Sequence, residues 1–110
     1  MEFQLLVGNG LVLVSRVKQE ISLIRSYNYT QANLDILYTA SFNLASAEDL
    51  LNYAIELYPT NSDVAGEKVL IACDAIKKVQ LMLMREFDAE VECESQLWFD
   101  SVAENIGICA

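Results

Sequence analysis

The sequence predicts an all-α protein, an antiparallel bundle of about four helices that forms one domain over residues 1–110. Apolar residues recur at spacings of three and four, as in a helix with one buried face. Turn-forming residues separate these segments. Hydrophobic residues make up 54% of the chain, which is enough for a domain of this length to bury a core without disulfides or a metal. We expect helices near residues 11–27, 31–58, 63–88 and 95–106.

The first helix, over residues 11–27, has one competing interpretation. Its apolar stripe consists of Leu13, Val17, Ile21, Ile24 and Tyr27. Just before it, Asn9-Gly10 lies between apolar runs, and Asn-Gly is the strongest short signal for a β-hairpin. In a helical chain, Asn9 would cap the helix, or the helix would continue through the glycines at a cost of about 1 kcal/mol each. We favour the helix because a lone hairpin is marginally stable and no other segment clearly completes a sheet.

Two longer stripes predict the second and third helices. The second helix carries Leu37, Ala40, Leu44, Ala47, Leu51, Ala54 and Tyr58, and the third carries Ala65, Val69, Ala72, Ile76, Val79 and Leu83. Thr30 is expected to cap the second helix and Pro59 to end it. Thr60 with Asp63 resembles a capping box for the third helix. Because only a few residues join them, the two helices are expected to pack antiparallel with their alanine-bearing faces together.

The segment 87–94 is the second place where a strand competes with a helix. Apolar and acidic residues alternate strictly there, with the period of a strand. Acidic residues form strands poorly, so a helix end followed by a linker explains the pattern as well. Ser95 would then cap a last helix that ends before Gly107. The alternative fold is therefore α+β, with an N-terminal hairpin and a strand near 87–94.

The charge balance limits the classes of partner. Sixteen acidic residues face seven basic ones, which gives a formal net charge of −9. Direct binding to nucleic acid needs a basic surface, so none is expected. Attraction to an anionic membrane is disfavoured for the same reason. A basic protein partner is electrostatically favoured, although acidity can also serve only to keep an apolar protein in solution.

Few residue types that carry out catalysis are present. The chain has no histidine, so Ser-His and Cys-His nucleophile pairs are absent and the commonest metal ligand is missing. A calcium loop starting at Asp88 fails, because Cys93 and Phe99 occupy the positions that require Gly and Glu. We therefore expect no enzyme activity, no cofactor and no specific metal site. A looser cation site in the acidic run 86–94 stays open at this point.

The cysteines and the N-terminal segment bear on location. The three cysteines, Cys73, Cys93 and Cys109, form no CxxC pair, and an odd count argues against a disulfide framework. The apolar segment 3–14 is too short to cross a bilayer. A signal peptide would open with a basic residue, whereas Glu2 stands here. We therefore expect a cytoplasmic protein without a membrane span.

The candidate partner-binding residues lie near the C-terminus, where the acidity concentrates. Residues 86–110 contain seven acidic residues and no basic one. The candidates are Glu86, Asp88, Glu90, Glu92, Glu94, Trp98 and Phe99. An aromatic pair among acids is typical of an interface anchor. The alternative, which we favour, is that Trp98 and Phe99 dock the last helix on the bundle.

Three functions follow, in order of preference. The first is a non-enzymatic protein-interaction module that self-associates and binds or regulates a partner protein. The apolar excess, the long Leu/Ala stripes and the missing catalytic residues favour it. The second is an acidic inhibitor that mimics nucleic acid and blocks a basic groove, as phages and mobile elements use. The third is a small-ligand binder that uses carboxylates and tyrosines.

Overall fold

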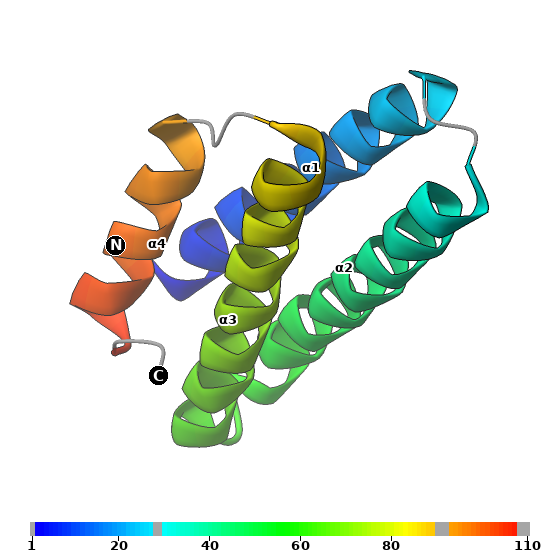
Figure 1. The fold of residues 1–110 in the computed structure, drawn as a ribbon. Coiled ribbons are helices and arrows are strands. Elements are labelled where there is room, and N and C mark those ends of the chain that lie inside the picture. The colour runs from blue at the N-terminus through cyan, green and yellow to red at the C-terminus, as the bar shows by residue number, and fades with distance from the viewer. Residues whose placement is uncertain (1, 28–29, 90–92, 108–110) are drawn as a thin grey trace.

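The computed structural model describes residues 2–27, 30–89 and 93–107, and these residues form four helices that pack together (Figure 1). They are α1 (Phe3–Tyr27), α2 (Gln31–Leu57), α3 (Ser62–Phe87) and α4 (Cys93–Asn105). The predicted all-α bundle is confirmed. The bounds of α2, α3 and α4 lie within two residues of those expected from the sequence.

The α+β alternative is wrong, because the described residues contain no strand. The Asn9-Gly10 signal lies inside α1, which begins at Phe3 and not near residue 11. Leu6, Val7 and Gly10 are buried and extend the apolar stripe of α1 by two turns, so packing overrides the local turn preference. In the second candidate strand, Phe87 ends α3 and Cys93 begins α4, while residues 90–92 lie outside the described part of the chain.

The helix ends show which capping predictions hold. The Thr30 hydroxyl accepts a hydrogen bond from the Asn33 N–H at 3.2 Å, so Thr30 is the N-cap of α2 as expected. At α3 the expected capping box is wrong. The Asn61 side chain caps this helix instead, accepting from the Val64 N–H at 3.2 Å. An Asn side chain one residue closer to the helix provides the same acceptor as the predicted Thr.

The Leu/Ala stripes form the centre of the core. The α2 residues from Leu37 to Ala54 and the α3 residues from Ala65 to Leu83 that were assigned to the stripes are all buried. Alanine at alternate positions allows α2 and α3 to approach closely along their length. Tyr58 departs from the expected stripe. It is 44% exposed and stacks on Phe3 of α1, with ring centroids 4.1 Å apart.

The helices are arranged so that α2 and α4 lie on opposite sides of the bundle (Figure 1). Helix α2 packs against α1 and α3, and α4 packs against α1 and α3 without contacting α2. The 27 residues of α2 span about 40 Å at ~1.5 Å per residue, which accounts for most of the 46 Å length of the molecule. The outer face of α2 is consequently covered by no other described helix.

Candidate protein-binding surface

The described acids of the run 86–94 lie around the end of α3 and the start of α4. Glu86 is exposed in the last turn of α3, and Asp88 is its C-cap in the left-handed region at φ 53°. Glu94 lies in the first turn of α4 and forms an ion pair with Arg16 of α1. Glu90 and Glu92 lie outside the described residues. The described acids of this run therefore belong to two helix ends and the connection between them.

Trp98 and Phe99 are parts of the core. Trp98 is 5% exposed and Phe99 is 6% exposed. The Trp98 indole N–H donates a hydrogen bond to the Leu6 carbonyl of α1 at 2.9 Å, and the Lys77 ammonium lies 5.1 Å from the centroid of the Phe99 ring. These contacts fix α4 against α1 and α3. A partner protein would reach either ring only if α4 moved.

A buried polar pair adds to the attachment of α4. The side-chain amide of Gln80 on α3 donates a hydrogen bond to the Ser95 hydroxyl of α4 at 2.8 Å. Both residues are buried. The Gln80 Oε1 atom has no hydrogen-bond partner among the described residues. Polar groups therefore add to the apolar packing that positions α4.

The most exposed aromatic pair in the middle of a helix belongs to α2. Tyr38 is 75% exposed and Phe42 is 64% exposed, one helical turn apart. Both point away from the buried stripe that contains Leu44, because 3.6 residues per turn places them on the opposite side. Sequence reasoning missed this pair as a site, although the position of Phe42 opposite the Leu/Ala stripe was already visible in the spacing.

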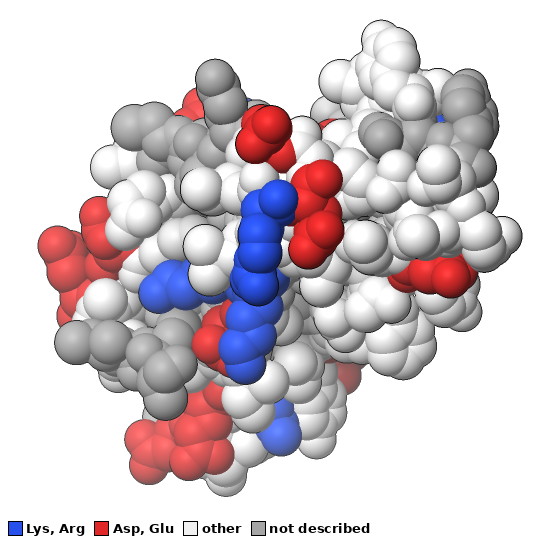
Figure 2. Space-filling model, in the orientation of Figure 1, with Lys and Arg blue, Asp and Glu red and all other residues white. Residues whose placement is uncertain are grey.

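Exposed side chains of α3 continue this surface, which we call the α2–α3 face. It consists of Asp35, Tyr38, Phe42, Asp49 and Tyr53 of α2 and Ile71, Lys78, Leu81 and Arg85 of α3. Figure 2 shows basic side chains running along α3 in the centre of the view, flanked by acidic ones and by a largely uncharged surface over α2. Helix α2 itself contains no basic residue. The face therefore combines exposed aromatic rings with charge that differs between its two helices.

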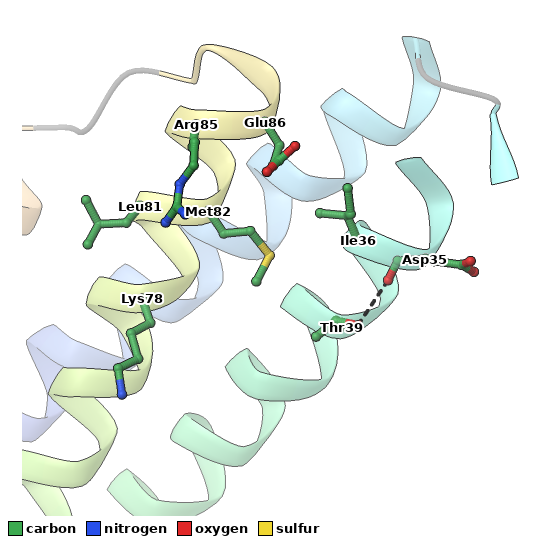
Figure 3. Close-up of a pocket in the computed structure, with 8 residues that line it drawn as sticks. All are labelled: Asp35, Ile36, Thr39, Lys78, Leu81, Met82, Arg85 and Glu86. Atoms are coloured by element: carbon green, nitrogen blue, oxygen red, sulfur yellow. Dashed lines mark hydrogen bonds between the residues drawn. The ribbon is translucent and has the colours of Figure 1, made fainter. Parts of the chain in front are cut away.

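A shallow hollow lies between the two helices of this face. It has a volume of about 520 Å³, and Ile36, Thr39 and Met82 form its floor together with charged residues at the rim. Figure 3 shows Met82 pointing from α3 toward α2, whereas the Asp35 carboxylate points away from α3. Lys78 and Arg85 stay on the α3 side. The charged residues that line the hollow, Asp35, Lys78, Arg85 and Glu86, come from both helices.

Two further hollows lie elsewhere on the bundle, one of them beside Trp98 between α1 and α4. The other, at the end of the bundle near Phe3 and Tyr58, is lined by Asp63 and Glu67. Both residues are exposed. Over residues 2–27, 30–89 and 93–107, no group of three or more Cys, Asp or Glu side chains is placed to hold a metal ion.

Comparison with known proteins identifies no similar protein. No family model matches the chain, and no curated protein or solved structure matches it. None of the described helices is long and apolar enough to cross a membrane.

Proposed function

We propose that this protein is a non-enzymatic protein-interaction module that binds protein through the α2–α3 face. The observation that carries the proposal is the Tyr38–Phe42 pair, which stays 75% and 64% exposed on a helix whose opposite side is fully buried. Aromatic side chains are enriched at the centres of protein interfaces because they bury a large area at a low cost in conformational entropy. The proposal includes self-association and action in the cytoplasm.

The core supports this interpretation of the pair. Leu44, Leu51 and their neighbours on α2 are already fully buried against α1 and α3, so the bundle does not need the outer rings for its own packing. Exposing two large rings costs solubility without adding stability. A partner that covers them would recover the apolar area.

The two alternative functions draw less support from the described residues. An acidic inhibitor would use the run from Glu86 to Glu94 with Trp98 and Phe99, yet both rings are buried and Glu94 is paired with Arg16. A small-ligand binder would gather tyrosines around a cavity. Of the hollows between α2 and α3, at the end of the bundle near Phe3 and beside Trp98, only the second is lined by a described tyrosine, which is Tyr58.

Co-purification tests the proposal. The tagged protein is expressed in its source cells beside a second, differently tagged copy, and retained proteins are identified by mass spectrometry. Tyr38→Ser/Phe42→Ser is expected to lose the specifically bound protein, whether that is a second copy or another chain. Leu23→Ser/Tyr27→Ser is the matched control, because those residues have the same spacing and are 59% and 76% exposed on α1. Equal retention by the α2 variant and wild type would contradict the proposal.

A further inference from the structure

The two helices of the α2–α3 face differ in the charge of their exposed side chains. Asp35, Phe42 and Asp49 follow one another at intervals of seven on α2, and Ile71, Lys78 and Arg85 do so on α3. An interval of seven returns to nearly the same side of a helix after two turns. Each helix therefore presents one straight row to the solvent, two acids with a ring between them on α2, and an isoleucine followed by two bases on α3.

The heights of these residues follow from the antiparallel packing. Asp35 lies 22 residues before the end of α2 at Leu57, and Arg85 lies 23 residues after the start of α3 at Ser62, so the two residues lie at nearly the same level along the bundle. Seven residues forward on α2 and seven residues backward on α3 lead in the same direction, which places Phe42 level with Lys78. The third level holds Asp49 and Ile71, so opposite charges share a level only at Asp35 and Arg85.

Charges of the two rows are not neutralised across the hollow. Asp35 accepts a hydrogen bond from Gln31 at 2.8 Å, within its own helix, and its carboxylate points away from α3 (Figure 3). Lys78 pairs with Asp74 at 2.9 Å on α3, and its side chain is still 74% exposed. No ion pair joins α2 to α3 in the described residues. Both rows are available to an external partner.

From these rows we infer that the occupant of the α2–α3 face is a second copy of this chain, related by a two-fold axis that runs along the hollow. The inference rests on the proposed function. Rotation about that axis lays α2 of one copy on α3 of the other without changing the heights. Asp35 then meets Arg85 of the second copy, twice by symmetry, and Phe42 meets Lys78 of the second copy in a cation–π arrangement.

A two-fold axis perpendicular to the helices pairs the charges of the two copies less well. With that axis through Phe42, α2 lies on α2 of the second copy, and Asp35 faces Asp49 with like charge. The long side of the molecule, 46 by 23 Å, is large enough for the roughly 800 Å² per partner that a stable dimer buries. The charges therefore favour the axis that runs along the hollow, and the exposed rings supply the apolar contact.

A charge-swap experiment tests the arrangement. The dimer dissociation constant is measured by sedimentation equilibrium for wild type, Asp35→Arg and Arg85→Asp, and for a 1:1 mixture of the two variants. Each variant alone is expected to weaken the dimer by at least about tenfold, because like charges then meet twice. The mixture is expected to recover the dimer to within about threefold, since every swapped residue meets its complement. Asp100→Arg, an exposed residue on α4, is the control and should leave association unchanged.

Three outcomes would overturn the inference: a wild-type monomer up to about 1 mM, a variant that dimerises as well as wild type, or a mixture that stays monomeric. Circular dichroism of each variant checks that it is folded. The inference and the proposed function fail separately. A monomer that retains a different protein through Tyr38 and Phe42 in the co-purification would overturn the dimer and self-association, and would leave the binding of a partner protein through this face standing.

Discussion

The indole ring of Trp98 lies directly against the Cα of Gly10, so that the last helix of the chain rests on the first at a position where a side chain has no room. A Cβ atom built on Gly10 would lie 2.9 Å from Trp98 Cε2 and closer still to Cζ2. The same ring donates its N–H to the Leu6 carbonyl one turn earlier. The packing of α4 on α1 therefore depends on Gly10, a residue that the Asn9-Gly10 signal assigns to a turn.

Gly10→Ala is expected to destabilise the protein, although alanine is the better helix former. Overpacking costs roughly 1–3 kcal/mol, and alanine recovers about 1 kcal/mol of helix propensity, so the net loss reaches up to about 2 kcal/mol. Urea unfolding measures the change. Because Trp98 is the only tryptophan, its fluorescence spectrum should shift as well.

Gly8→Ala is the matched control in the same helix. No atom lies within 4 Å of a Cβ built there, so this variant is expected to gain roughly 0.5–1 kcal/mol with an unchanged Trp98 spectrum. Equal effects of the two substitutions would contradict the packing of Trp98 on Gly10.

The buried pair of Gln80 and Ser95 gives a second stability prediction. Ser95→Ala leaves the Gln80 amide without its acceptor and is expected to cost about 1–3 kcal/mol. Gln80→Leu/Ser95→Ala removes both polar groups, together with the Oε1 atom that has no partner, and should be within about 1 kcal/mol of wild type or more stable. A double variant that is less stable than Ser95→Ala in urea unfolding would show that the pair stabilises α4 in another way.

Substitutions at two residues of α2, Leu44 and Phe42, distinguish a core position from a position on the proposed binding surface. Leu44→Ala is expected to lower the free energy of unfolding by about 2–5 kcal/mol, because Leu44 is fully buried among α1, α2 and α3. Phe42→Ala should change it by less than about 0.5 kcal/mol, because the ring is mostly in water. Both values are measured at protein concentrations below the onset of self-association. A large loss for Phe42→Ala would assign this ring to the fold and remove it from the proposed interface.

Salt should weaken the dimer that we infer. Raising NaCl from about 0.1 M to 1 M shortens the Debye length from about 10 Å to 3 Å, which screens the Asp35–Arg85 contacts at the edge of the interface. We expect the dissociation constant to rise by roughly three- to tenfold in sedimentation equilibrium. A dimer that tightens with salt would indicate an apolar interface without the charge pairing.

Most of the fold was predictable because the helical spacing of apolar residues is repeated along the chain. The Leu/Ala stripe from Leu37 to Ala54 recurs over many turns, and each turn adds to the same conclusion. The start of α1 was not predictable in this way. A two-residue turn signal at Asn9-Gly10 outweighs the short apolar stretch before it, and the reason for the glycine lies 88 positions away at Trp98.

Part of the candidate site could also be predicted from the sequence, and part could not. That Trp98 and Phe99 would dock α4 could be anticipated from their size, and the structure buries both. The exposed Tyr38–Phe42 pair was visible in the helical spacing, but tyrosines at the edge of a core are common and carry little signal alone. The charge relation between Asp35 and Arg85 needed the antiparallel packing of α2 and α3, because 50 positions separate them in the chain.

Photo-crosslinking at position 42 tests most directly the claim that the chain binds protein through the α2–α3 face. A benzophenone amino acid replaces Phe42 in one strain and Leu23 of α1 in another, and both are irradiated in the source cells. We expect a specific protein adduct from position 42, with a second copy or another protein, and little or none from position 23. Adducts from position 23 alone, or equal adducts from both positions, would contradict it.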